Sequence, residues 1–131
     1  SLLYEANQKY QKTIDNQLLK KFHPWKSFLD LGGQLVFSSD SPVSSSSPLK
    51  SIAYASIERP TNMNIYQRVP SHSAIKAWTY AAAKVNHIEK KGHIKEGFIA
   101  DLIFLNNDPL MSPSKSNVIT TMIEGQIAYS T

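Results

Sequence analysis

The spacing of apolar residues changes at Lys91, and this change divides the chain into two parts. Before it, apolar residues recur every three or four positions, which predicts helices; the clearest stripe lies in 71–87, with Ser71 as the expected N-cap. After it, short apolar runs separated by glycine predict strands at 101–105, 118–123 and 126–129. The order of elements is therefore typical of an α/β part followed by a small β layer.

The first part also contains one short run of the kind found in a buried parallel strand, Gln34 to Ser39. Helices are predicted on both sides of it: one or two within 2–22, a short one from Pro24, and one that begins at Ser47-Pro48 and reaches about Arg59. Gly32 and Gly33 are expected to end the helix that precedes the strand.

Composition narrows the class of protein. The 131 residues suit a single domain, and the absence of cysteine excludes disulfides and Cys-ligated metal sites. No apolar run is long enough to cross a bilayer, so we expect a soluble, cytoplasmic protein without a membrane partner. The net charge of +4 comes from scattered lysines and only two arginines, which argues against nucleic acid as a partner. Because Ser1 stands where Met is usual, the chain is either a processed product or a piece of a longer protein.

Asp40 is the strongest candidate for a chemical role. It follows the predicted strand and opens a serine-rich loop, and α/β active sites lie at the carboxyl ends of strands. Such a carboxylate can bind a divalent metal or act as a general base. The alternative is that Asp40 only forms a turn before Ser41-Pro42, its side chain binding the backbone two residues on.

Other polar and aromatic residues have simpler explanations. The four histidines, His23, His72, His87 and His93, lack the spacing of paired metal ligands. The lysines Lys84, Lys90 and Lys91 are expected at the solvated end of the long helix. The two tryptophans, Trp25 and Trp78, lie on apolar stripes and are expected in the core.

Three stretches taken together resemble the metal-dependent amidohydrolases, with the N-substituted formamide deformylase-like branch as the nearest. Residues 22–43, with Ser38-Ser39-Asp40-Ser41-Pro42 in place of Gly-Ser-Asp-x-Pro, resemble the segment through the last barrel strand. Residues 73–83 resemble a helix that carries Ala-Leu-x-x-x-Thr-x-x-Ala-Ala. Residues 91–110, closed by 123–129, resemble the tail Gly-x-Ile-x-x-Gly-x-x-Ala-Asp-Leu.

The resemblance implies an α/β fold, namely the C-terminal fragment of a (β/α)8 metal-dependent hydrolase barrel plus strands of a flanking β-sandwich. Residues 1–88 would form the C-terminal segment of the barrel, with its last strand at 34–39. Residues 89–131 would form the C-terminal part of the small β-sandwich. The glycines of that layer are then expected to serve turns, and Asp101 to bind nearby backbone.

The resemblance also implies hydrolysis of carbon–nitrogen bonds in a small amide-type substrate by a metal-activated water. Asp40 would be both catalytic residue and metal ligand, with zinc as the expected divalent metal in the full-length enzyme. The family's His-x-His and its later ligands have no counterpart here, so the isolated chain is expected to bind no metal and to be inactive. Its partners would be the remainder of its own barrel and further copies of itself. Two alternatives stay open: a regulatory or binding protein on the same scaffold, and a stand-alone interaction domain.

Overall fold

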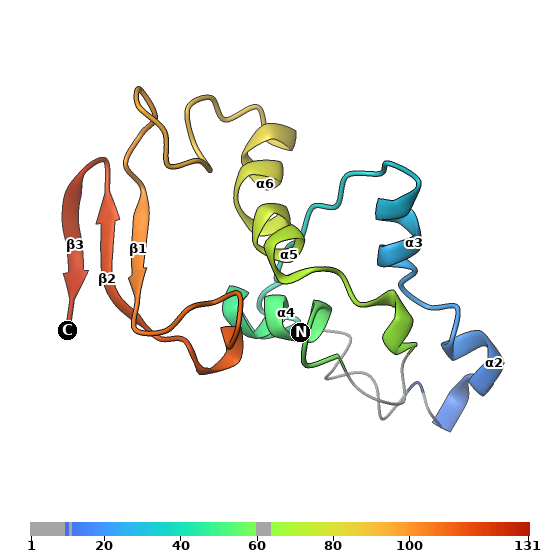
Figure 1. Ribbon diagram of the computed structural model, residues 1–131. Coiled ribbons are helices and arrows are strands. Elements are labelled where there is room, and N and C mark those ends of the chain that lie inside the picture. Colours follow the sequence, from blue (N-terminus) through green and yellow to red (C-terminus); the bar gives the residue numbers. More distant parts are fainter. Residues whose placement is uncertain (1–9, 11, 60–63) are drawn as a thin grey trace.

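The computed structural model describes residues 10, 12–59 and 64–131, and it places helices at one end of the molecule and a sheet at the other (Figure 1). The helical elements are α2 (Asn16–Leu19), α3 (Trp25–Asp30), α4 (Pro48–Ala55), η1 (Ile65–Gln67), α5 (Ser71–Trp78), α6 (Tyr80–Val85) and η2 (Pro113–Lys115). The strands are β1 (Leu102–Leu105), β2 (Val118–Ile123) and β3 (Gln126–Ser130). The helix predicted at 2–22 lies partly outside the described residues. In the part of the chain that the structure describes, no helix is long and apolar enough to span a bilayer.

Helix α4 begins where its sequence predicts and ends earlier. The Ser47 side chain accepts a hydrogen bond from the Lys50 amide at 3.4 Å, and Pro48 occupies the first turn, which confirms the predicted cap. The helix stops at Ala55 instead of reaching Arg59. The Ser56 hydroxyl donates to the Ile52 carbonyl at 2.7 Å, and the chain leaves the helical conformation at Ser56. Side-chain bonds of this kind compete with the helical backbone ladder, which explains the early end.

The long helix predicted over 71–87 is divided into α5 and α6 at Thr79, whose φ and ψ are −116° and −95°. The Thr79 hydroxyl donates to the Ile75 carbonyl at 2.9 Å. Gly92 approaches the same point so closely that a Cβ on it would lie 2.6 Å from Tyr80 Cα. The predicted N-cap is also displaced by one residue: Pro70 holds the cap position, and Ser71 is the first residue of the helix.

Small and apolar residues of α4 and α5 form the core between the helices. Ile52, Ala55, Val69 and Ala74 are buried together, and partly buried side chains pack around them. These surrounding residues are Trp25, Leu29, Leu35, Phe37, Ile75 and Trp78. Both tryptophans therefore pack against the core, as expected. Alanines at the contact let the helices approach closely, because they add little side-chain volume.

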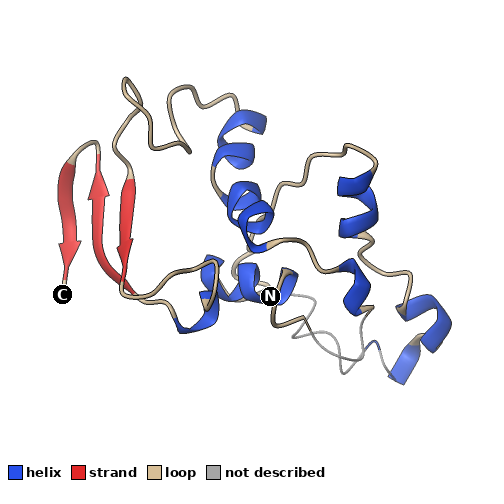
Figure 2. Ribbon diagram, viewed as in Figure 1, coloured by secondary structure: helices blue, strands red, loops and turns tan. Residues whose placement is uncertain are grey.

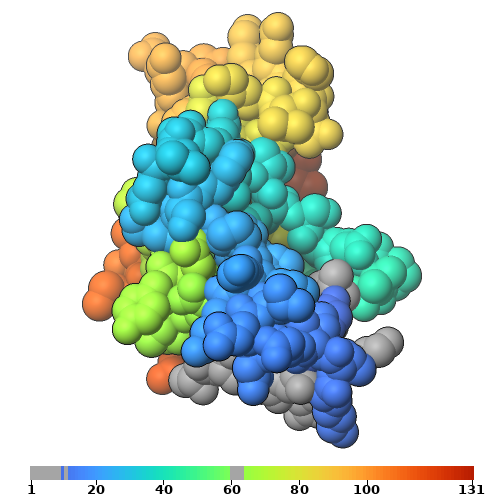
Figure 3. Space-filling model, turned by 90° about the vertical axis from the view of Figure 1, so that its right-hand side faces the viewer, coloured from blue at the N-terminus to red at the C-terminus, as the bar shows by residue number. Residues whose placement is uncertain are grey.

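A second contact joins α3 to η1. The side-chain carbonyl of Gln67 accepts a bond from the Ser27 amide at 2.9 Å, and its amide nitrogen donates to the Ser27 hydroxyl at 2.7 Å. Figure 3 shows this face of the molecule, with α2 and α3 in blue and η1 in yellow-green beside them. These two bonds link α3 to η1, although Ser27 and Gln67 are 40 positions apart in the chain.

The segment 34–39, predicted as a strand, is extended but belongs to no sheet among the described residues (Figure 2). Its backbone makes one bond to α5, from the Phe37 amide to the Ala77 carbonyl at 3.1 Å. A parallel strand is defined by hydrogen bonds to neighbouring strands, and the described residues supply none beside it. The segment is extended, as expected, but its side chains alternate between exposed and half-buried, so the predicted burial of the strand is not observed. Its pairing with a neighbouring strand is not confirmed within the described residues.

The three predicted strands of the second part form one antiparallel sheet in the order β1-β2-β3. A two-residue turn at Glu124-Gly125 joins β2 to β3, with φ of 50° and 81°, the left-handed pair that a type I′ hairpin requires. Ile103, Thr121 and Tyr129 stand opposite one another across the sheet. The β layer is confirmed with nearly the predicted bounds.

Asp101, just before β1, links the preceding loop to the turn between β2 and β3. One carboxylate oxygen pairs with the Lys91 ammonium at 2.5 Å, and the other accepts a bond from the Glu124 amide at 2.9 Å. These bonds lower the pKa of Asp101, the Lys91 bond most, and the Asp101 bond raises the pKa of Lys91. Lys91 is thus an ion-pair partner and not simply a solvated helix end. The backbone role expected for Asp101 is confirmed.

Candidate functional site

Asp40 ends the extended segment in a left-handed backbone conformation, with φ of 54°. Few residues other than glycine adopt this region, and aspartate is among those that tolerate it. The Asp40 carbonyl accepts bonds from the amides of Val43 at 2.8 Å and Ser44 at 3.3 Å, which closes the following turn. The main chain of Asp40, and not its side chain, therefore forms the turn.

The side-chain bonds that stabilise the turn come from neighbouring serines. The Ser38 hydroxyl accepts from the Asp40 amide at 3.4 Å, and the Ser39 hydroxyl accepts from the Ser41 amide at 3.2 Å. The Asp40 carboxylate is exposed, and within residues 10, 12–59 and 64–131 no hydrogen bond or ion pair involves it. The alternative in which this carboxylate serves only as a turn former is not what the structure shows.

The two sides of the extended segment have different surroundings. Leu35, Phe37 and Ser39 are half-buried toward the helices, whereas Val36, Ser38 and Asp40 are exposed. This alternation is that of a β-strand, in which successive side chains point to opposite sides. Asp40 therefore lies on the side of the segment that the described residues leave uncovered.

The histidines lie apart from Asp40 in the chain and in different surroundings. The His23 ring contacts Trp25 at 5.3 Å between centroids, and burial, with a smaller effect of Arg59, lowers the pKa of His23. His72 Nε2 lies 3.3 Å from the Ser73 hydroxyl, and His93 stacks on Tyr80 at 4.1 Å. His87 follows α6 and its C-cap Asn86, with a φ of 55°.

These side chains do not complete a metal centre. Among the described residues no three His, Asp or Glu side chains form a group that could hold an ion. A catalytic zinc normally takes three protein ligands, so the Asp40 carboxylate alone does not make a zinc site.

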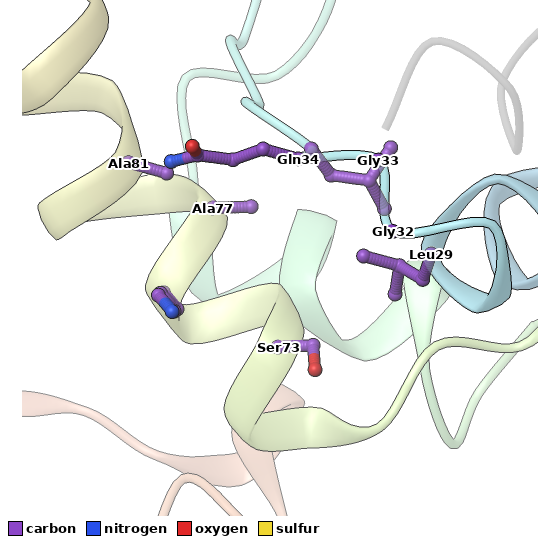
Figure 4. A pocket seen from close by; sticks show the side chains of 9 residues that line it. Leu29, Gly32, Gly33, Gln34, Ser73, Ala77 and Ala81 are labelled. Carbon is purple, nitrogen blue, oxygen red and sulfur yellow. The ribbon is translucent and has the colours of Figure 1, made fainter.

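A groove of about 270 Å³ lies beside the start of the extended segment, away from Asp40 (Figure 4). The Gln34 side chain extends across it toward Ala81, and Ala77 and Ser73 project from α5. The other lining residues are Leu29, Gly32, Gly33, Leu35 and Lys76. Its walls therefore combine small and apolar side chains with the polar side chains of Gln34, Ser73 and Lys76.

Arg59 is the main feature that the sequence did not reveal. It is only 3% exposed, and its guanidinium donates to the carbonyls of Gln67 at 3.4 Å and His23 at 3.3 Å. Burial, with a smaller contribution from Arg68, lowers the pKa of Arg59. An arginine before a proline carries no sequence pattern that indicates burial, so only the structure identifies it.

Comparison with known proteins supplies the context for this geometry. A sequence description of the Amidohydrolase family matches residues 2–129. The Bacillus subtilis (strain 168) protein YtcJ, whose name assigns it to the amidohydrolases, is 30% identical over 122 residues, which cover 85% of this chain and 23% of that protein. A crystal structure of an uncharacterized metal-dependent hydrolase from Pyrococcus furiosus matches with 32% identity and a TM-score of 0.58, over 67% of this chain and 18% of the other.

A second crystal structure, of an uncharacterized metal-dependent hydrolase from Pyrococcus horikoshii OT3, has a TM-score of 0.71 over 88% of this chain and 25% of the other. At 21% identity that likeness concerns the fold alone. The chain spans about a quarter of the length of these relatives, or less. Since the family match extends over nearly all of its residues, the chain belongs to the amidohydrolase family.

Proposed function

We propose that this chain is part of a longer metal-dependent hydrolase of carbon–nitrogen bonds, in which Asp40 is a catalytic carboxylate and a metal ligand. The observation that carries the proposal is the Asp40 carboxylate itself, which ends an extended segment, faces the open side and is not used by the turn. Carboxylates at the ends of barrel strands are placed to act on a bound water and on a metal.

The extended segment supports a barrel as the surrounding fold. It has the alternating exposure of a strand, helices on its half-buried side and no sheet neighbour in the described structure. We propose that 34–39 is the last strand of a (β/α)8 barrel within residues 1–88, and that 89–131 belong to a β-sandwich. The remainder of the same barrel would supply the neighbouring strands and cover the groove at Gln34.

The other metal ligands would then lie outside this chain. Zinc is the proposed metal, because histidine and carboxylate side chains suit it, and the proposed substrate is a small molecule with an amide-type bond. On its own the chain is expected to have no hydrolase activity, and its exposed apolar residues are expected to cause self-association. Val43, Ile94 and Met111 are each at least two-thirds exposed.

The decisive test is Asp40→Asn in the longer enzyme, assayed for metal-dependent hydrolysis of small amides. Loss of a catalytic carboxylate is expected to reduce kcat by roughly 10²–10⁴-fold. The matched control is Asp30→Asn, which removes the same charge from an exposed carboxylate that pairs with Lys26 on α3. Unchanged turnover in Asp40→Asn, measured at equal metal content, would rule out the proposed role.

A further inference from the structure

The buried Arg59 side chain contacts the aromatic ring that supports the segment carrying Asp40. Its guanidinium carbon lies 5.1 Å from the centre of the Trp25 ring. The same Trp25 ring lies 5.2 Å from the Phe37 ring, at an interplanar angle of 54°. The buried Arg59 guanidinium therefore contacts the Trp25 indole, and the indole contacts the Phe37 ring. Phe37 belongs to the extended segment.

The Trp25–Phe37 contact supports the extended segment on its helical side, where Leu35 also packs against the core. The segment has no neighbouring strand in the described structure, and Phe37 makes its one backbone bond to α5, at Ala77. Only Ser38 and Ser39 lie between Phe37 and Asp40, so the two Cα atoms are at most about 10 Å apart. Phe37 is therefore close enough along the chain for its position to influence that of Asp40.

The position of Arg59 is itself fixed from several directions. One terminal nitrogen donates to the Gln67 carbonyl and the other to the carbonyls of Phe22 and His23, at 3.3–3.5 Å. In the described part of the chain no carboxylate pairs with Arg59, and its Nε is buried without a partner. Its bonds to carbonyls of two separate segments hold the guanidinium in one orientation.

We propose that Arg59 is a positioning residue for Asp40, acting through Trp25 and Phe37 to fix where the extended segment ends. The proposal rests on the role proposed above for Asp40. Lysine cannot replace arginine here, because the flat, forked guanidinium both stacks on a ring and donates in several directions, whereas an ammonium is a point charge.

The first test is a two-dimensional NMR spectrum of the chain with Arg59→Lys. The amide resonances of residues 37–44 are expected to shift, while those of β2 stay in place. The control is Arg68→Lys, the same exchange at the other arginine, which is exposed. The proposal is overturned if residues 37–44 do not shift in Arg59→Lys, or if Arg68→Lys shifts them equally.

A second variant covers the case in which Arg59→Lys fails to fold. Trp25→Phe keeps an aromatic ring beside Phe37 but removes the wider indole surface under the guanidinium. A shift at Phe37 alone follows from the loss of the neighbouring indole, so the proposal requires shifts at residues 40–44, and their absence overturns it.

The longer enzyme provides a readout that a purely structural role would not change. Arg59→Lys is expected to lower kcat per folded molecule by roughly 10–100-fold with little change in KM, since small misplacements of a catalytic group have effects of this size. An unchanged kcat would overturn the proposal. If Asp40→Asn leaves turnover intact while the NMR shifts occur, the proposed function fails and the structural coupling stands.

Discussion

The β layer and the segment that ends at Asp40 are both predicted to contain strands, but among the described residues only the β layer forms them. Strands β2 and β3 are joined by a two-residue turn, so each finds its partner within a few residues. The segment 34–39 has the same alternation of exposed and half-buried side chains and yet has no partner in the described structure. A strand pattern in a sequence thus specifies an extended backbone, while a sheet also requires a neighbour within reach.

The two regions also differ in what holds them together. The helical part has a buried core around Ile52 and Ala74, which are 4% and 0% exposed. In the sheet, by contrast, all five residues of β3 are exposed, and Ile103 and Ile127 are 53% and 66% exposed. The helical part is stabilised by burial, and the β layer mainly by its backbone ladder.

The largest expected effect is therefore in the helical core. Ile52→Ala is expected to lower the free energy of unfolding by about 2–5 kcal/mol, because it leaves a cavity among buried neighbours. The matched change Ile127→Ala, on the exposed strand β3, is expected to stay within about 0.5 kcal/mol. Urea denaturation of both variants measures the difference. Similar losses at the two positions would contradict the contrast between a buried core and an open layer.

Gly92 tests how closely the two regions are connected. It has a φ of 83°, and a Cβ there would meet the backbone of Thr79 and Tyr80 at 2.6–3.0 Å. Gly92→Ala is expected to lower the free energy of unfolding by about 2–4 kcal/mol, combining left-handed backbone strain with overpacking. Gly97→Ala is the control, since Gly97 has a φ of 79° with open space around it. Gly97→Ala should lower the free energy of unfolding only by the backbone strain, about 1 kcal/mol. If the two variants lose equal free energy of unfolding, the close approach of Gly92 to α6 does not contribute to stability.

The smallest expected effect concerns the Lys91–Asp101 pair, and it depends on pH. The pKa of Asp101 is lowered in the folded chain, so its contribution is present above the ordinary carboxyl value and is lost as the pH falls through the lowered one. The pKa of Lys91 is raised, so its contribution is present below the ordinary ammonium value and is lost as the pH rises through the raised one. Asp101→Asn should therefore lower the melting temperature at neutral pH and have no effect in strong acid. A difference that persists in strong acid would mean that the pair is not its cause.

Much of the fold follows from sequence because the determining contacts are local. The Ser47-Pro48 helix start and the Glu124-Gly125 turn involve only neighbouring residues, and both were predicted at their observed positions. The break at Thr79 could not be predicted, because it coincides with the approach of Gly92, which is distant in sequence. The burial of Arg59 likewise depends on carbonyls 36 and 37 residues earlier in the chain.

The candidate site was predictable to a similar degree. The strand pattern before Asp40 and the family resemblance both indicate this residue, and the structure adds that its carboxylate is not used by the turn. That distinction depends on which neighbouring hydroxyls take the turn bonds, and Ser38 and Ser39 are as suited to them as Asp40. Composition and spacing could not show which of the side chains of Ser38, Ser39 and Asp40 makes the turn bonds.

Strand β3 has a practical consequence for anyone who prepares this chain. In the described structure it pairs with β2 on one side only, so its outer N–H and C=O groups face solvent along all five residues. An unpaired edge strand of this kind can pair with a strand of another chain, so concentrated protein is prone to edge-to-edge assembly. A lysine in place of Ile127 or Tyr129 would interrupt that process without touching the helical core, and it would give a tractable sample for the spectra described above.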